Sequence, residues 1–374
     1  MDKRNPVRIG ILGTGRIAVD AHVRDIRAAG GTVAAMADTA PGRAARHAQL
    51  LGVPAAFLSL DDMLRSGTID AVDVCTPPVT HLPAVLAALD AGCPVYLEKP
   101  PAMNRREMET MAAASVRAGL PLVTGTNQVF YPAVRFAKAM IDSGEAGIIY
   151  AVECHKTIRR FYRKGWHRSR AVAGGGVVMD SSTHRMDLAL HLLSNPEVQS
   201  VSARTFSYFA GLDEPEASRQ SYLVMDEAER IASGLPAPDR EPVDVEDSVF
   251  ALFRLAGGGV LSLREMVGVN MPDETVLRIY GTKAGLVLRM AGPGAGTVSV
   301  YAQDGSGMPV DRDPPPEVTL NTEGSHTGAF RHFFQCVRGE TDFRPGLDRA
   351  VRLMGMVDAI YASAGKGGAE MPIL

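Results

Sequence analysis

Short apolar runs alternate with helical stretches along the first third of the chain. The runs cover residues 7–12, 33–37, 69–75, 94–97 and 122–124. Runs of this length are typical of buried strands in a parallel sheet. Residues 81–91 have helical periodicity, and Asn104 with Glu107 forms the capping-box pattern that begins another helix. This alternation predicts an α/β domain with a doubly wound parallel sheet, in which ligands bind at the carboxyl ends of the strands.

The pattern changes after about residue 125. Five further segments have strand character, and glycine turns or long loops connect them in place of crossover helices. These segments are residues 150–155, 198–206, 249–255, 260–266 and 275–280. They predict a second, α+β domain with a large, mostly antiparallel sheet. We place the first domain at residues 1–125 and the second at residues 126–374.

The remaining segments of the second domain have three different characters. Residues 212–240 are polar and are interpreted as an insertion, with a helix near residues 225–232. Residues 291–316 are rich in Gly and Pro and are expected to form a surface loop. Residues 326–338 and 347–364 are amphipathic helices, and the terminal helix is expected to pack back on the first domain.

Composition narrows the class of protein. The chain has 374 residues, 46% of them hydrophobic, and a net charge of −3, which favours two ordinary globular domains over a nucleic-acid-binding or membrane-surface protein. The four cysteines contain no C-x-x-C pair, which argues against a disulfide framework or a zinc knuckle. No leader-like or bilayer-spanning stretch is visible, so we expect a cytoplasmic location.

The first predicted strand runs directly into a dinucleotide-binding fingerprint. Gly13, Gly15 and Ala18 form the G-x-G-x-x-G/A pattern, and Asp38 ends the second strand about twenty residues later. The glycines allow the turn and the approach of a pyrophosphate, while the acidic residue accepts a ribose hydroxyl. We therefore predict a Rossmann domain that binds NAD. NADP stays open because Arg43 follows Asp38 and can offset its charge.

Residues with catalytic chemistry follow a strand end and a glycine run. Lys99 closes the strand at residues 94–97, and Asp180 and His184 lie one helical turn apart after residues 174–176. His184 can act as general base, Lys99 can stabilise an oxyanion, and Asp180 can orient the donors. Glu98 is expected to pair with a neighbour. From spacing alone, a buried structural histidine explains His184 equally well.

A metal site is the alternative interpretation of the same helix. Asp180, His184, Asp187 and His191 recur on one helical face, and this ligand set suits zinc or manganese. The same stripe is explained by one catalytic turn followed by a polar helix at a domain boundary. We adopt that second interpretation, which places no metal there.

Residues 156–170 are dense in cations and contain the only tryptophan. One interpretation is a solvated basic loop. The other is a pocket wall in which Tyr162 or Trp166 packs against a sugar face or the nicotinamide. An arginine would then bind an anionic group of the substrate. The candidates are Arg159, Arg160 and Arg163.

Together these motifs resemble the glucose-fructose oxidoreductase, inositol dehydrogenase and rhizopine-catabolism family (Gfo/Idh/MocA) over nearly the whole chain. The motifs are Gly13-x-Gly15-x-x-Ala18, Asp38, Cys75-Thr76-Pro77-Pro78 with His81, Glu98-Lys99-Pro100, Gly174-Gly175-Gly176 before Asp180 and His184, and Asp358-Ala359-Ile360-Tyr361-Ala362-Ser363. The chain departs from the usual pattern at Ser182, where a glycine is common, and in the long insertion at residues 212–240. Both departures leave the substrate open.

The resemblance implies an open-faced antiparallel sheet used in homodimers or homotetramers, and a Lys99, Asp180 and His184 set that acts on a sugar or cyclitol hydroxyl. Expected cofactor contacts are Gly13, Thr14, Gly15, Arg16, Ile17, Asp38, Cys75, Thr76, Pro77, His81, Glu98, Lys99 and Asn127. Expected substrate contacts are Lys99, Tyr162, Arg163, Trp166, Asp180 and His184.

The predicted activity is hydride transfer between the nicotinamide and a secondary hydroxyl of a sugar, sugar derivative or cyclitol. The substrate is expected to be a small molecule, with an anionic one favoured if the basic segment lines the pocket. Two alternatives stay open: a redox-neutral epimerase or glycoside-cleaving enzyme that retains NAD, and a dinucleotide-binding regulator without catalysis. The sequence leaves open the sugar, the carbon oxidised and the oligomer size.

Overall fold

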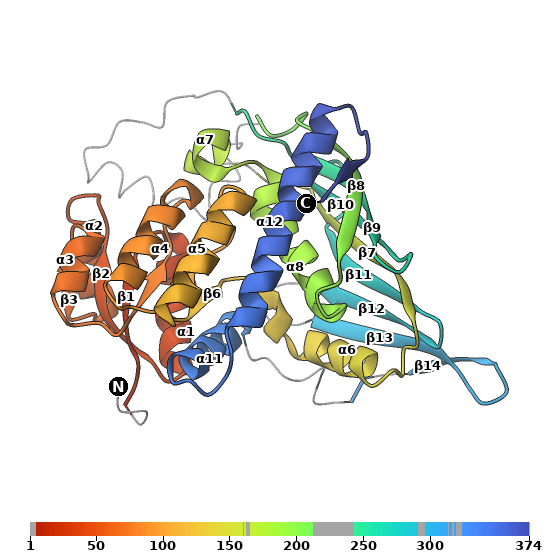
Figure 1. Ribbon diagram of the computed structural model, residues 1–374, viewed down its shortest axis with the longest axis horizontal. Helices are drawn as coiled ribbons and strands as arrows, with labels where there is room; N and C mark the ends of the chain where they lie inside the picture. The colour runs from red at the N-terminus through yellow and green to blue at the C-terminus, as the bar shows by residue number, and fades with distance from the viewer. Residues whose placement is uncertain are drawn as a thin grey trace.

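A computed structural model gives the fold of the chain. It describes residues 5–159, 161, 165–211, 243–290, 296–312, 314–315, 318 and 324–373. Two sheets lie beside each other, and helices α8 (Thr183–Leu192) and α12 (Arg344–Gly365) run between them (Figure 1). Among the described helices, none is long and apolar enough to cross a membrane.

The first sheet is parallel throughout, as predicted. Its order is β3-β2-β1-β4-β5-β6, the doubly wound order of a Rossmann domain. The strands are β1 (Arg8–Leu12), β2 (Thr32–Ala37), β3 (Ala55–Phe57), β4 (Ala71–Val74), β5 (Val95–Leu97) and β6 (Leu122–Thr124). The sequence analysis did not predict β3, which has only three residues. Leu12 pairs with both Ala37 and Val74, so that the strand ends lie along one edge.

Helices connect these strands on both faces of the sheet. They are η1 (Ala18–His22), α1 (Val23–Ala28), α2 (Arg43–Leu51), α3 (Leu60–Arg65), η2 (Pro78–Thr80), α4 (His81–Asp90) and α5 (Arg105–Ala118). The predicted cap of α5 is confirmed, because the Asn104 side chain accepts a hydrogen bond from the Glu107 amide at 3.0 Å. The Glu107 carboxylate in turn accepts one from the Met103 amide.

The second sheet has the order β14-β13-β12-β11-β7-β10-β9-β8-β15, and only β7 and β10 pair in parallel. The strands are β7 (Ile149–Ile158), β8 (Val198–Phe206), β9 (Ser248–Leu255), β10 (Val260–Val267), β11 (Glu274–Gly281), β12 (Ala284–Met290), β13 (Gly296–Gln303), β14 (Pro309–Arg312) and β15 (Met371–Pro372). The prediction of a large, mostly antiparallel sheet is confirmed.

The prediction of a surface loop at residues 291–316 is wrong for the part of this segment that the structure describes. That segment contains β13 and β14, which form a hairpin around a turn at Asp304–Met308. Val298 and Val300 are buried at alternate positions, which is strand periodicity. The density of Gly and Pro in the segment obscured this short alternation.

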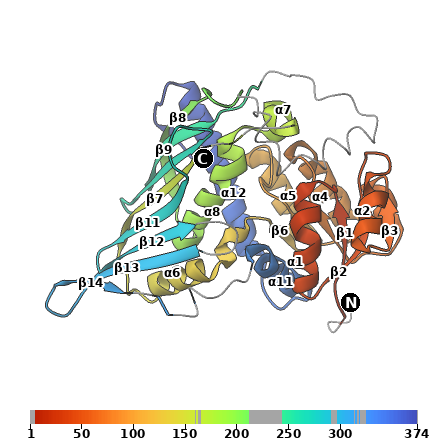
Figure 2. The same ribbon diagram turned by 180° about the vertical axis from the view of Figure 1, so that it is seen from behind.

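Helices cover one face of the second sheet and leave the other open (Figures 1 and 2). The covering helices are α6 (Pro132–Asp142), α8 and α12, which pack on the strands and bury their alternating apolar side chains. Helix α12 also packs against α5 of the first domain. The predicted insertion at residues 212–240 lies outside the described residues.

Helix α11 (Ser325–Val337) belongs to the core of the first domain although it comes from the end of the chain. Its Phe330, Phe333 and Phe334 are fully buried in one apolar cluster with Val7 and Ile9. This packing brings the first turn of α11 to the sheet edge that carries the fingerprint.

Candidate functional site

The fingerprint turn leaves an open cradle above Gly15. Gly13 has φ +87°, and a Cβ there would lie 3.0 Å from the carbonyl of Cys75, so only glycine fits. A Cβ on Gly15 would meet no protein atom within 4 Å. Ala18 is buried at the beginning of η1, directly after this turn. The geometry is that of a turn open to a phosphate group on one side and closed against the sheet on the other.

Asp38 lies at the edge of this cradle and is nearly buried. Its Oδ2 accepts hydrogen bonds from the backbone amide and the hydroxyl of Thr14, both at 2.9 Å, and its Oδ1 accepts one from the Ala40 amide. A carboxylate oxygen has two lone pairs, so Oδ1 can accept a further hydroxyl. The Arg43 guanidinium lies 3.7 Å from Oδ2 and offsets part of the charge.

His81 contacts the Thr76-Pro77 turn that follows β4. The two ring nitrogens of His81 lie 2.8 Å from the Thr76 carbonyl and 3.3 Å from the Pro101 carbonyl. Burial lowers the pKa of His81. A neutral ring has one N–H, which the shorter contact assigns to Nε2, donating to the Thr76 carbonyl. The candidate role of His81 is therefore to position Thr76 and Pro77.

Glu98 and Cys75 are turned toward the interior of the first domain. Glu98 Oε1 lies 3.2 Å from Nε2 of the buried His22, which confirms the expectation that Glu98 pairs with a neighbour. His22 Nδ1 lies 2.8 Å from Asp73 Oδ2 and 3.2 Å from Cys75 Sγ. Burial lowers the pKa of His22, but Asp73 and Cys75 outweigh burial, and its pKa is raised well above the usual value.

Other expected cofactor residues have protein partners in the structure. Arg16 is exposed and pairs with Asp20 at 3.0 Å. Asn127, which opens η3 (Asn127–Phe130), donates to the Ser325 hydroxyl at 2.9 Å. Ile17 is 36% exposed beside the turn. Their cofactor contacts stay predictions.

Lys99 and Asp180 meet across the two domains. Lys99 Nζ donates to Asp180 Oδ1 and to the Asp180 carbonyl, each at 2.9 Å. Burial lowers the pKa of Lys99, but Asp180 and Glu98 raise it more, so its pKa stands above its usual value. Both side chains keep about a quarter of their surface exposed, at 24% and 23%. Lys99 therefore presents a fixed ammonium to the solvent-facing side of the site.

His184 lies one turn beyond Asp180, in the first turn of α8, which follows η5 (Val178–Ser182). Burial and the charges of Lys99, Arg185 and Lys156 lower its pKa well below the usual value. Its Nδ1 is buried with no hydrogen-bond partner among the described residues. The ring is therefore neutral and able to accept a proton, as a general base requires.

The glycines at residues 174–176 make close contacts with the protein's own residues. A Cβ on Gly175 would lie 1.8 Å from the Tyr361 hydroxyl, and one on Gly176 would lie 1.8 Å from the Glu246 carbonyl. Glycine is therefore required at these two positions by packing within the protein. They allow the turn before η5 to pack closely against Glu246, which precedes β9, and against Tyr361 of α12.

Glu246 fixes the beginning of the helical segment that carries Asp180 and His184, and it was not predicted from the sequence. Its buried Oε1 accepts hydrogen bonds from the amides of Gly176 and Val178 and from the Tyr361 hydroxyl, at 2.9, 3.0 and 3.0 Å. Its Oε2 lies 3.2 Å from Arg170 of α7 (Arg170–Ala173). A carboxylate at a helix N-terminus satisfies free amides and favours the helix dipole.

A second missed group lies beside the catalytic turn. The Ser181 hydroxyl donates to Glu265 at 2.5 Å and accepts from Lys156 Nζ at 2.6 Å. Arg185 Nε lies 4.0 Å from the same fully buried Glu265 carboxylate. Burial lowers the pKa of Lys156. A signal for Glu265 was present, because strand alternation places it on the same buried face as Leu261 and Leu263.

The basic segment is only partly described. Tyr162 and Arg163, with Arg160, lie outside the described residues. Trp166 is in η4 (Gly165–Arg168), 37% exposed, and stacks on His167 with ring centroids 3.6 Å apart. The backbone amide of Arg159 donates to Asp273. The substrate roles of this segment stay predictions.

The four residues of the alternative metal stripe do not converge. Asp187 pairs with Arg349 at 2.7 Å, and burial lowers the pKa of His191 to about 4. Among the described residues, the groups close enough to share one ion include neither Asp187 nor His191. The helix beyond His184 is packed, with Asp187 paired to Arg349, and the catalytic role of the turn at Asp180 and His184 stays a prediction.

Known proteins match both parts of the chain. Residues 7–126 match a family model described as "Oxidoreductase family, NAD-binding Rossmann fold". Residues 138–373 match the "Oxidoreductase family, C-terminal alpha/beta domain" of the same group. The two matches include every strand of both sheets.

Relatives extend over the full length. A D-glucoside 3-dehydrogenase of Escherichia coli is 24% identical over 97% of each chain. The structure of a levoglucosan dehydrogenase in complex with NADH matches with a TM-score of 0.81 at 20% identity, over 99% of this chain and all of that one. An aldose-aldose oxidoreductase from Caulobacter crescentus matches with a TM-score of 0.78 at 23% identity, over 98% and 100%.

Proposed function

The chain belongs to the Gfo/Idh/MocA oxidoreductase family, and from that premise we propose that it transfers a hydride between a nicotinamide cofactor and a secondary hydroxyl of a sugar, sugar derivative or cyclitol. The observation that carries the proposal is the Lys99 ammonium, fixed by Asp180, beside the neutral His184. These groups stand where the first domain's strand edge meets the second domain. The named activities of the relatives support the class of substrate.

The residues of the first domain fit NAD. The open space above Gly15 suits a pyrophosphate, and Asp38 Oδ1, which accepts one hydrogen bond from Ala40, has a lone pair left for a ribose hydroxyl. When bound, NAD supplies the hydride acceptor. We propose NAD over NADP, because a 2′-phosphate would stand close to the Asp38 carboxylate, with only Arg43 to offset the repulsion.

Three side chains divide the work on the substrate. His184 takes the hydroxyl proton, because the neutral form that its lowered pKa favours has one ring nitrogen able to accept a proton. Lys99 donates a hydrogen bond to the same oxygen as negative charge develops on it. Asp180 holds Lys99 in place and offers an acceptor to a neighbouring hydroxyl.

The test is reduction of NAD by a panel of neutral sugars, cyclitols and uronates, followed as NADH formation at 340 nm by the wild-type chain and by His184→Asn. We expect NADH with at least one polyol and loss of most turnover in the variant. If no compound on the panel reduces NAD or NADP, the proposed activity is rejected.

Two finer proposals concern substrate charge and assembly. We propose that the basic segment favours an anionic substrate, so Arg159→Ala should raise KM for a uronate far more than for a hexose; equal effects would reject this.

We also propose that the open sheet face joins copies of this chain. Phe250 and Leu252 of β9 are each 40% exposed there, and Tyr301 of β13, farther along the sheet, is 45% exposed. Leu252→Glu should lower the mass measured by light scattering.

A further inference from the structure

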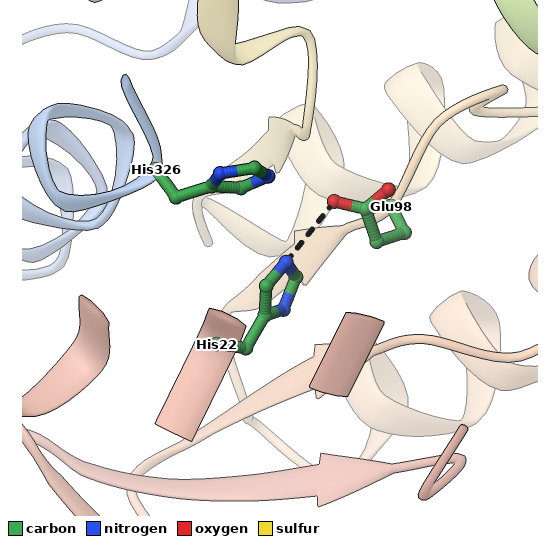
Figure 3. A group of neighbouring side chains, drawn as sticks. All are labelled: His22, Glu98 and His326. Atoms are coloured by element: carbon green, nitrogen blue, oxygen red, sulfur yellow. Dashed lines mark ion pairs between the residues drawn. The ribbon is translucent and has the colours of Figure 1, made fainter. Parts of the chain in front are cut away.

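Three side chains from distant parts of the chain meet behind the candidate site. His22 ends η1, Glu98 follows β5, and His326 lies in the first turn of α11 (Figure 3). One ligand atom from each lies within 4.8 Å of the other two. We propose that His22, Glu98 and His326 form a binding site for a divalent metal ion of the zinc type, separate from the catalytic residues.

The residue types and their support suit such an ion. Two imidazoles and one carboxylate are a ligand set that zinc takes in proteins. His22 Nδ1 lies 2.8 Å from the fully buried Asp73 carboxylate, which turns Nε2 toward Glu98. A carboxylate on the far nitrogen is the usual support of a metal-binding histidine, because it fixes the ring and its tautomer.

Polar atoms at this place have few hydrogen-bond partners. His22 Nε2 and Glu98 Oε1 are both buried and lie 3.2 Å apart, and among the described residues neither has a partner besides the other. The Tyr96 hydroxyl is also buried without one, and the Tyr96 ring packs edge-on against His22. Burial of polar atoms with few partners is costly, and a bound ion would give His22 Nε2 and Glu98 Oε1 a shared ligand in place of their single contact.

The spacing matches coordination for one pair of ligands. Zinc–nitrogen and zinc–oxygen bonds of about 2.0–2.1 Å in a tetrahedron place neighbouring ligand atoms about 3.3 Å apart. His22 Nε2 and Glu98 Oε1 are 3.2 Å apart. His326, whose ring centroid is 5.4 Å from that of His22, has to move inward by about 1.5 Å at most to complete the set.

The ion would join three segments that lie far apart along the sequence. η1, the end of β5 and α11 are separated by more than seventy and more than two hundred residues, and a shared ion would hold them together in the folded chain only. Binding to the folded state alone stabilises it by mass action. The proposed role is therefore structural and does not depend on the proposed function.

The experiment uses the full-length protein, stripped with chelator and dialysed. Zinc is titrated against a competing dye, cobalt is added to record the visible absorption of a tetrahedral site, and the melting temperature is measured with and without zinc. We expect one equivalent per chain, a tetrahedral cobalt spectrum, and a rise in melting temperature. His326→Gln should weaken zinc binding at least tenfold.

The matched control is His332→Gln, which changes another largely buried histidine of α11 outside the group. It should bind zinc as the wild type does. Cys75→Ser tests the neighbouring group of His22, Asp73 and Cys75. The proposal is overturned if the wild type binds no zinc, if His326→Gln binds as tightly as the wild type, or if Cys75→Ser alone loses the ion.

Discussion

Replacing Glu246 with glutamine should loosen the helix that carries Asp180 and His184. Glu246 Oε1 accepts three hydrogen bonds, from the amides of Gly176 and Val178 and from the Tyr361 hydroxyl. A hydrogen bond to a charged group contributes roughly 1.5–3 kcal/mol and one to a neutral group roughly 1 kcal/mol, so three bonds weakened by about 1 kcal/mol each lower the free energy of unfolding by about 3 kcal/mol.

The change should also reach catalysis, because the three bonds set where the turn before η5 begins. A displacement of a catalytic group by about 1 Å costs on the order of a hundredfold in rate. We expect kcat to fall by roughly ten- to a hundredfold, while the Kd for NAD stays unchanged because the fingerprint lies in the first domain.

The assay is urea unfolding together with steady-state kinetics and NAD titration. Tyr361→Phe removes one of the three bonds and should cost about 1 kcal/mol, a third of the effect. Glu274→Gln is the matched control, since it changes an exposed carboxylate of β11 that faces His155 and Arg278. If Glu246→Gln unfolds at the wild-type midpoint with the wild-type kcat, Glu246 does not position the helix.

Three further outcomes are expected. Lys99→Met and His184→Asn should each lower kcat by roughly 10²- to 10⁴-fold with little change in NAD binding by fluorescence; near-full turnover in either would reject its role. His191 has its pKa lowered to about 4 mainly by burial, so the unfolded chain binds a proton that the folded chain does not as pH falls below about 6.5. The free energy of unfolding should therefore drop by about 2–3 kcal/mol more between pH 7 and 4.5 in the wild type than in His191→Gln, and equal drops would contradict this. Arg43→Ala should widen the preference for NAD over NADP, because each unit of repulsion from Asp38 costs about 1–4 kcal/mol at 4 Å; tighter NADP binding in the variant would be the opposite result.

Local patterns were enough to predict most of the first domain. The fingerprint, the strand ends and the cap at Asn104 depend on residues close together in sequence. Strand β3 was missed because three residues carry too little periodicity. In the second domain, β13 and β14 were missed because glycine and proline at their ends conceal the alternation of Val298 and Val300.

The residues of the candidate site also differ in how far the sequence alone identifies them. Lys99, Asp180 and His184 could be proposed from sequence because each stands in a recognisable motif, and the structure brings Lys99 and Asp180 together. Glu246 and Glu265 were missed because their partners lie 70 and 84 residues away in sequence, and only the tertiary fold brings these groups together. Charge in an apolar strand, as at Glu265, is the one local sign of such a partner.

Deuterium transfer decides whether this chain moves a hydride from a carbinol carbon to NAD with Lys99 and His184 acting on the oxygen. A substrate labelled at the reacting carbon is turned over, and the reduced cofactor is examined by mass spectrometry. We expect the label in NADH with a primary isotope effect on turnover, and we expect Lys99→Met and His184→Asn to suppress it. Turnover of the sugar or cyclitol with no label in the cofactor would show that no hydride passes to NAD.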